Sequence, residues 1–248
     1  MSKSAVCGLV TSVLCAAALA GVAAPAAAAE ADHGAEPSQQ DPEALGNHQK
    51  NIRVDIGGRG QLIKSTGFDP FSKNDALGQV SLQASYGFWA QDRLSLAAVV
   101  GFDYGGSSAN ARSDSASLEL EHFTLAPELR YHVLRVLALT AKVGPTLTRE
   151  AAQVSSGLDA TLVRTGWKFG FDATLGVAAE LWGYRNGNSH KPRLWLAGEG
   201  GYGWSAPLEL AFKPEDSGSV PQRLTPLSFD DLTLAGPLFR ITAGLSFW

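Results

Sequence analysis

The sequence predicts an all-β protein, an eight-stranded antiparallel transmembrane β-barrel, and three observations carry that prediction. The chain opens with an export signal. Eight later segments alternate apolar and polar residues with a period of two, which is the period of a strand. The last segment, Phe239 to Trp248, alternates up to an aromatic C-terminus, which is typical of the final strand of an outer-membrane barrel.

The first element is a signal peptide, which we expect over residues 1–29. Lys3 gives a positive start, Ala5 to Ala24 form an apolar stretch, and an Ala-x-Ala cleavage site ends at Ala29. An uncleaved membrane anchor is the alternative interpretation. The small residues around the site favour cleavage, so the mature chain should begin at or near Glu30.

Composition excludes several classes of protein. Both cysteines, Cys7 and Cys15, lie in the signal, so neither a disulfide scaffold nor a thiolate metal site is expected in the mature chain. Removing the signal takes Lys3 away and leaves 19 basic and 24 acidic residues, a balance that argues against nucleic acid as a partner. No metal-ligand cluster and no cofactor motif is visible, so we expect no cofactor.

A membrane protein with this sequence has to be a barrel. No apolar run after the signal approaches the roughly 20 residues that a membrane helix needs. Only helices and closed barrels satisfy their backbone hydrogen bonds in lipid. Residues 30–50 are polar, acidic and aperiodic, which predicts a disordered periplasmic linker, and residues 51–248 form the predicted barrel.

The first four predicted strands carry apolar side chains at every second position. These side chains are expected to face lipid. They are Ile52, Val54 and Ile56 in Asn51–Ile63; Val80, Leu82, Ala84, Tyr86 and Phe88 in Gln79–Ala90; Leu94, Leu96, Ala98, Val100, Phe102 and Tyr104 in Arg93–Tyr104; and Phe123, Leu125, Leu129 and Tyr131 in Leu118–Val133.

The last four predicted strands repeat the pattern. Their lipid-facing sets are Leu137, Leu139, Ala141, Val143 and Leu147 in Val136–Thr148; Trp167, Phe169, Phe171, Leu175, Val177 and Leu181 in Leu162–Tyr184; Leu194, Leu196, Tyr202 and Trp204 in Arg193–Trp204; and Phe239, Ile241, Ala243, Leu245 and Phe247 in Leu232–Trp248.

The connections alternate between long and short. Membrane barrels have long loops outside the cell and short turns in the periplasm, so this alternation predicts both the fold and its orientation. The short turns lie near Gln91-Asp92 and Leu134-Arg135, and Arg185–Pro192 is intermediate. The long loops, expected outside, are Lys64–Gly78, Gly105–Ser117, Arg149–Thr161 and Ser205–Asp231.

Charged residues occupy the other alternate positions of the predicted strands, so they have the opposite parity from the apolar residues. An Arg or Lys facing lipid at mid-depth costs about 2–4 kcal/mol, so this parity should face the lumen. Six acids and seven bases share it, and this near balance favours mutually paired ions over an ion-selective path. The predicted lumen charge network is Arg53, Asp55, Arg59, Glu128, Arg130, Lys142, Lys168, Asp172, Glu199 and Arg240, and the remaining inward charges are Asp103, Glu180 and Arg193.

A soluble lipocalin-like barrel is the alternative fold, because parity alone does not distinguish inside from outside. Three features favour the membrane barrel. Loop lengths alternate, the C-terminus is aromatic, and aromatic residues gather near both predicted ends of the strands. Aromatic residues are enriched at the two interfaces of a bilayer.

On these features the chain resembles the small outer-membrane β-barrel families, the outer membrane protein A-like transmembrane domain and its relatives. The resemblance covers Asn51 to Trp248 and is one of architecture. It implies the cell outer membrane of a Gram-negative bacterium, outer-membrane lipid and the barrel-assembly machinery as partners, the latter through the C-terminal strand, and a monomer without enzymatic activity. Phe247 has the lipid-facing parity, so either the assembly signal is read there or the strand carries a bulge.

Four local features stand out within the strands. Pro127 and Pro145 lie inside neighbouring strands, which predicts a paired bulge, and Gly57 to Gly60 predicts a strongly bent strand. His122 beside Thr124 is similar to the His-x-Ser pair of the lipid A deacylases. Both residues face inward here, which disfavours that chemistry, and His132 at a turn is expected to be solvated.

The last strand carries one charge whose partners can be predicted. Arg240 lies about eight residues from the C-terminal end, roughly 20 Å up a tilted strand. Barrel closure places the first and seventh strands beside it, so Glu199 and Asp55 are its expected partners, with Asp172 one strand further away.

The leading functional hypothesis is a structural or surface-exposed outer-membrane barrel with at most restricted passage of small solutes. A narrow transporter of small hydrophobic compounds is the second hypothesis, and it would need a lateral opening and an apolar inner pocket. A lipid-modifying enzyme is the third.

Overall fold

The computed structural model describes residues 51–111, 114–134, 136–155, 161–182, 192–211, 213–214 and 228–247. The predicted signal peptide and linker lie outside these residues. Within the described part of the chain, no helix is long and apolar enough to cross a membrane.

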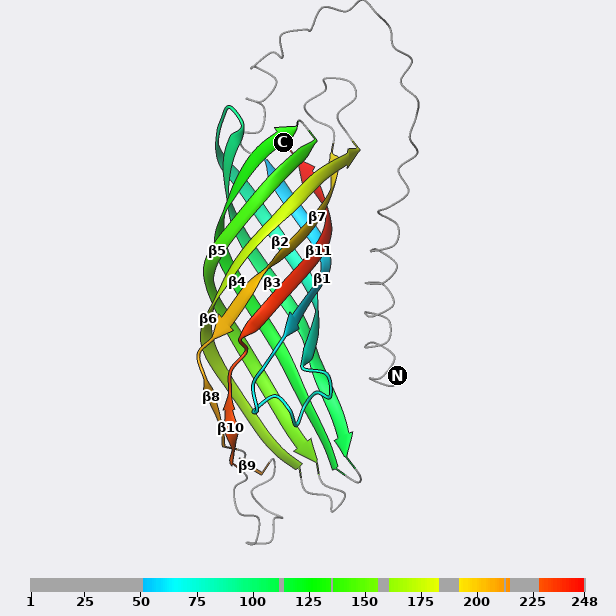
Figure 1. The fold of residues 1–248 in the computed structure, drawn as a ribbon, viewed down its shortest axis with the longest axis vertical. Helices are drawn as coiled ribbons and strands as arrows, with labels where there is room; N and C mark the ends of the chain where they lie inside the picture. Colours follow the sequence, from blue (N-terminus) through cyan, green and yellow to red (C-terminus); the bar gives the residue numbers. More distant parts are fainter. Residues whose placement is uncertain are drawn as a thin grey trace, which may run out of the picture.

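Eight antiparallel strands of the described chain form a closed ring. Each strand pairs with its successor, and the last pairs with the first. The strands are tilted against the long axis of the barrel (Figure 1). They are β1 (Ile52–Leu62), β2 (Ala76–Gln91), β3 (Leu94–Ala111), β4 (Asp114–Leu134), β5 (Leu137–Ser155), β6 (Thr161–Trp182), β7 (Arg193–Ser205) and β11 (Gly236–Phe247).

Three short strands lie in the connection between β7 and β11. β8 (Leu208–Ala211) pairs with β10 (Ser228–Leu232), and β9 (Lys213–Pro214) pairs with the beginning of β6. The predicted eighth strand, Leu232–Trp248, is therefore divided, because β10 ends at Leu232 and β11 begins at Gly236.

The two ends of the barrel differ. At the turn end, β1 begins, β11 ends, and Asp92-Arg93 joins β2 to β3 with Asp92 at a φ of 50°. A tight hairpin turn requires such a positive φ. At the opposite end, the loop end, β3 to β6 reach well beyond β1, β7 and β11 (Figure 1).

Two predicted loops are wrong for this reason. Gly105–Ser117 and Arg149–Thr161 are largely strand, since β3 continues to Ala111 and β5 continues to Ser155. These extensions form a raised wall, which we define as Ser107–Ala111, Asp114–Leu118, Ala152–Ser155 and Thr161–Arg164. The raised wall was not predicted from the sequence, because its apolar residues change to the inward parity.

The reversal is visible along β4. Toward the turn end, outward residues such as Leu125 are apolar and inward residues such as Glu128 are charged. Toward the loop end, Leu118 and Leu120 face inward, while Glu119 is exposed. A strand wall in lipid has to be apolar outside, and a wall in water has to be apolar inside. The reversal therefore marks where the wall leaves the membrane.

The predicted bulge at Pro127 and Pro145 is also wrong. The register between β4 and β5 is the same on both sides of the prolines, from Thr124 opposite Thr146 to Glu128 opposite Lys142. Both prolines face outward and remain paired with β3 and β6 respectively. Missing N–H donors interrupt the ladder without inserting a residue.

β1 runs through its glycines without a register shift against either neighbour. β11 is likewise in unbroken register with β1 from Leu238 to Phe247, and Phe247 faces outward. A bulge in the described part of the last strand is thus excluded, and Trp248 lies outside the described residues.

Candidate functional site: the barrel interior

The interior of the barrel holds all the buried charges that the structure describes. The thirteen charges predicted to face inward are buried, including the ten of the predicted network. Glu150 is also buried, and sequence reasoning missed it because it lay in a predicted loop. The seven bases are Arg53, Arg59, Arg130, Lys142, Lys168, Arg193 and Arg240, and the seven acids are Asp55, Asp103, Glu128, Glu150, Asp172, Glu180 and Glu199. We call this balanced set the interior ion network.

Glu128 organises the network toward the turn end. Its carboxylate accepts a hydrogen bond from Nε of Arg130, and it lies 3.6 Å from Nζ of Lys142 and 3.9 Å from Nη2 of Arg53. Arg53 in turn donates to Asp55 over 2.7 Å. Three cations around one carboxylate compensate its desolvation, which a single partner does less well.

Glu199 links this group to the middle of the barrel. It forms ion pairs with Lys142 and, over 3.5 Å, with Nη1 of Arg240. Lys142 also donates to Oε1 of Gln83 on the opposite wall over 3.1 Å. Side chains of four strands, β2, β5, β7 and β11, are therefore joined through Lys142 and Glu199.

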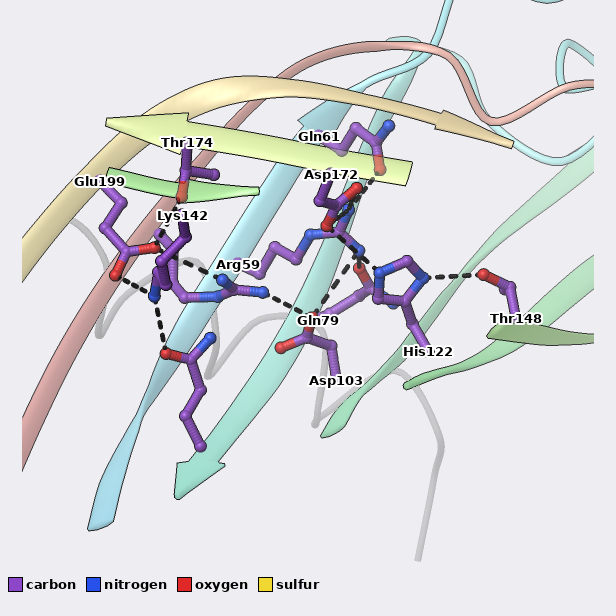
Figure 2. A network of polar contacts seen from close by, with 12 residues as sticks. Arg59, Gln61, Gln79, Asp103, His122, Lys142, Thr148, Asp172, Thr174 and Glu199 are labelled. Atoms are coloured by element: carbon purple, nitrogen blue, oxygen red, sulfur yellow. Dashed lines mark hydrogen bonds and ion pairs between the residues drawn. The ribbon is translucent and has the colours of Figure 1, made fainter. Parts of the chain in front are cut away.

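Arg59 occupies the centre of the second group. Its guanidinium donates to Oε1 of Gln79 over 2.8 Å and to Oε1 of Gln61 over 3.1 Å. It pairs with Asp172 over 3.1 Å and lies 3.8 Å from Asp103. In Figure 2 these side chains, which come from β1, β2, β3 and β6, point toward one another.

Arg240 contradicts part of the prediction made for it. Glu199 is a partner as expected, but the shortest ion pair of Arg240 is with Asp103 across the lumen, at 2.7 Å. Asp55 instead pairs with Arg53. The register explains the error, because Arg240 lies opposite Arg59, and Asp55 lies four residues, about 13 Å, closer to the turn end.

His122 connects a hydroxyl to a carboxylate. Its Nδ1 lies 2.7 Å from Oγ1 of Thr148 and its Nε2 lies 3.3 Å from Oδ2 of Asp172 (Figure 2). The hydroxyl partner is thus Thr148 of the neighbouring strand rather than Thr124. A hydroxyl, an imidazole and a carboxylate in line resemble a nucleophile with its base, but Thr148 is buried inside the barrel, with 1% of its surface exposed.

His132 was expected to be solvated and is buried. Its Nε2 lies 3.2 Å from Oγ of Ser95 on β3. The register shift between His132 and Leu134 comes only after this residue, so His132 keeps the inward parity.

Two further ion pairs lie away from the centre. Arg193 pairs with Glu180 over 3.5 Å, and Lys168 pairs with Glu150. Nζ of Lys168 also donates to the carbonyl of Leu232 over 3.2 Å. This second bond attaches the connection before β11 to the interior. No group of residues that could hold a metal ion occurs in the described chain.

The loop end of the interior is mainly apolar, with Glu150 and Lys168 as its buried ion pair. A buried group, which we call the mouth cluster, consists of Ile63, Phe68, Phe71, Leu77, Leu118, Leu120, Ala152, Leu162, Leu232 and Leu234. Phe68 and Phe71, in the predicted loop Lys64–Gly78, are fully buried. They belong to the link between β1 and β2, which folds inward against Leu118, Leu120, Ala152 and Leu162 of β4 to β6.

Hydrogen bonds hold the link between β1 and β2 and the connection before β11 in the loop end of the barrel. Oγ of Ser65 donates to the carbonyl of Asp231 over 3.4 Å, and the amide of Leu234 donates to Oγ of Ser205 over 2.9 Å. Nε2 of Gln61 donates to the carbonyl of Leu234 over 3.4 Å. The mouth cluster is therefore attached to the barrel on the side where the wall is short.

The outer surface is apolar at the level of the interior ion network. Exposed hydrophobic side chains such as Leu125, Phe169 and Leu175 cover the wall there. Near its loop-end boundary, Phe102 packs on Phe123 with ring centroids 4.9 Å apart. An apolar outside around a charged inside is the inverse of a soluble protein and is typical of a membrane barrel.

Comparison with solved structures agrees with this arrangement. A major outer membrane protein of Thermus thermophilus superposes with a TM-score of 0.50 at 14% identity, covering 81% of this chain and 100% of that one. The fold is that of a small outer-membrane β-barrel. With its apolar outer belt, the chain is an integral protein of the cell outer membrane.

Two other barrels are similar at lower scores. OprG of Pseudomonas aeruginosa has a TM-score of 0.47 at 12% identity, covering 80% of this chain and 96% of OprG. Ail of Yersinia pestis, in complex with the heparin analogue sucrose octasulfate, has 0.45 at 12% identity, covering 80% of this chain and 99% of Ail. No protein-family model and no curated protein matches the sequence.

Proposed function

We propose that this protein is a monomeric barrel with a closed lumen, and that its role is structural or surface-exposed, with at most restricted passage of small solutes. The observation that carries the proposal is that interior ion pairs join strands that are not neighbours. Arg240 of β11 reaches Asp103 of β3, and Arg59 of β1 reaches Asp172 of β6. Side chains that touch across the lumen occupy the space that a solute would need.

The width of the barrel supports this proposal. An eight-stranded barrel has an interior that side chains can just fill. Two barriers follow one another along its axis, the interior ion network and the mouth cluster. A solute would have to displace both a set of desolvated charges and a packed apolar group.

The two other functions find less support. A transporter of hydrophobic compounds needs an apolar pocket at membrane depth, where the interior is charged. The interrupted ladder at Pro127 and Pro145 offers no opening, because a Cβ placed on Gly144 would lie 2.3 Å from the carbonyl oxygen of Leu125. Lipid-modifying chemistry at Thr148 would need access for lipid to a hydroxyl that is enclosed by the wall.

The raised wall is the part of the protein that the proposal assigns to the cell surface. The loop end should face outside and the turn end should face the periplasm. The mature chain is expected to lack cysteine, so a membrane-impermeant maleimide can report orientation at introduced thiols. Ser108→Cys on the raised wall should react on intact cells, and Gln91→Cys at the turn end should react only after the outer membrane is broken.

Reaction of Gln91→Cys on intact cells, with Ser108→Cys protected, would contradict the orientation. Solute passage is tested separately, by swelling of proteoliposomes in small sugars and amino acids. The proposal expects rates close to those of empty liposomes, with a general porin as the positive control.

A further inference from the structure

The junction between β1 and β11 differs from every other strand junction of the ring. It joins Ile52–Gln61 to Leu238–Phe247, and we call it the closing seam. Every other neighbouring pair in the ring is consecutive along the barrel sequence and is connected by a turn or a link. The closing seam joins the first strand to the last, so only non-covalent contacts hold it.

The closing seam also carries an unfavourable pair of charges. Where two charged residues lie directly opposite each other on neighbouring strands, the described register pairs Glu128 with Lys142, Glu121 with Arg149, and Arg240 with Glu199. All three pairs have opposite signs. The one like-signed pair in the described register is Arg59 opposite Arg240, at the closing seam. Like charges directly opposite destabilise an antiparallel pair.

Carboxylates from the rest of the barrel neutralise these two arginines. Oδ2 of Asp103 lies 2.7 Å from Nη2 of Arg240 and 3.8 Å from Nη1 of Arg59, so one carboxylate serves both. Asp172 lies 3.1 Å from Arg59, and Glu199 lies 3.5 Å from Arg240. These acids belong to β3, β6 and β7, and none belongs to the seam strands.

The backbones of the closing seam approach closely. A Cβ placed on Gly57 would lie 1.9 Å from the carbonyl oxygen of Ile241, and one on Gly60 would lie 2.2 Å from the ring of Phe239. Glycines at these positions permit the contact but contribute no side-chain packing to it. Pairing at this part of the seam therefore depends on its hydrogen bonds and charges and not on side chains of Gly57 and Gly60.

We propose that the interior carboxylates, with Asp103 at their centre, act as an electrostatic lock on the closing seam. While they are in place, Arg59 and Arg240 attract a shared counter-charge instead of repelling each other. When the charge of Asp103 is lost, the wall opens at this seam before it opens between any other strands. The lock operates whether or not the lumen passes solutes, so its test is separate from that of the proposed function.

Hydrogen exchange of the full mature protein in lipid nanodiscs tests the lock. In Asp103→Asn, the amides of β1 and β11 should exchange on the order of a hundredfold faster, the change expected when a buried charge loses its partner. Amides of β4 and β5 should keep their rates. Glu150→Gln is the matched control, because Glu150 is equally buried and ion-paired, but it and its partner Lys168 lie on β5 and β6, which do not form the seam. It should leave β1 and β11 unchanged.

A second variant separates the lock from general damage to the interior. Asp103→Asn with Arg240→Gln removes one of the opposed arginines and leaves Arg59 with Asp172 and Glu199 with Lys142. Slow exchange of β1 and β11 should return, and if Asp103→Asn alone does not assemble, the double variant should. Unchanged exchange in Asp103→Asn, faster exchange spread over all strands, or a double variant no better than the single one would each overturn the proposal.

Discussion

The interior ion network and the mouth cluster occupy the same tube, yet they are built from opposite chemistry. Around the network the outer wall faces lipid, so the polar residues have to be inside. Around the mouth cluster the raised wall faces water, so the apolar residues are inside, as in a soluble sandwich. The interior of a membrane barrel is thus determined by what surrounds each level of the wall.

The two regions also differ in how they tolerate change. A buried ion network depends on each partner, because removal of one leaves another charge desolvated and unpaired. An apolar cluster depends on volume, and its losses are graded. The charged level of the interior should therefore be more sensitive to substitution than the apolar level.

Loss of the Glu128 carboxylate, which has three cationic neighbours, should have the largest effect. Glu128→Gln leaves Arg53, Arg130 and Lys142 facing a neutral amide, so the free energy of unfolding should fall by about 3–5 kcal/mol. Denaturant unfolding in vesicles, followed by tryptophan fluorescence, measures it. Glu121→Gln, in the partly exposed pair with Arg149, is the control and should change stability by less than about 1 kcal/mol.

A charge placed on the outer wall should have a large effect only at membrane depth. Leu125 is exposed on the apolar belt, and Leu125→Arg should destabilise the barrel in vesicles by about 2–4 kcal/mol. Gln153→Arg, on the outer face of the raised wall, should stay within about 0.5 kcal/mol. Equal costs at the two positions would show that the parity reversal does not mark the membrane boundary.

A reduction of volume in the mouth cluster should have the smallest effect. Phe71→Leu keeps an apolar side chain in the cluster and should lower the free energy of unfolding by about 1–2 kcal/mol. It should leave the bilayer impermeable, since the interior ion network lies beneath. Ion conductance of this variant above that of the wild type would mean that the mouth cluster alone closes the lumen.

Much of this architecture could be predicted from alternation alone. The lipid-facing residues and the thirteen inward charges follow from period two, because a strand in a membrane has to separate the two kinds of residue. The raised wall could not be recognised with the same rule. Leu118 and Leu120, at the beginning of the predicted strand Leu118–Val133, continue the alternation with the opposite parity. The preceding stretch, Gly105–Ser117, has no apolar set on the outward face, and it was therefore predicted as a loop. Glu150 was not predicted to face inward because it lies in the predicted loop Arg149–Thr161.

Specific partners were harder to predict than faces. Adjacent-strand reasoning gave Glu199 for Arg240 and missed Asp103, because in a narrow lumen a guanidinium can reach three strands away. Pro127 and Pro145 show a similar limit. The sequence indicates that each proline removes a hydrogen-bond donor. Whether a bulge forms there depends on the register with both neighbouring strands, which the local sequence does not determine.

Single-channel conductance of the purified mature protein in planar bilayers tests the central claim most directly. If the interior ion network and the mouth cluster fill the lumen, the wild-type protein should show no stable open state across the voltage range that the bilayer tolerates. A large, long-lived conductance of porin size, seen with correctly folded protein, would contradict the account.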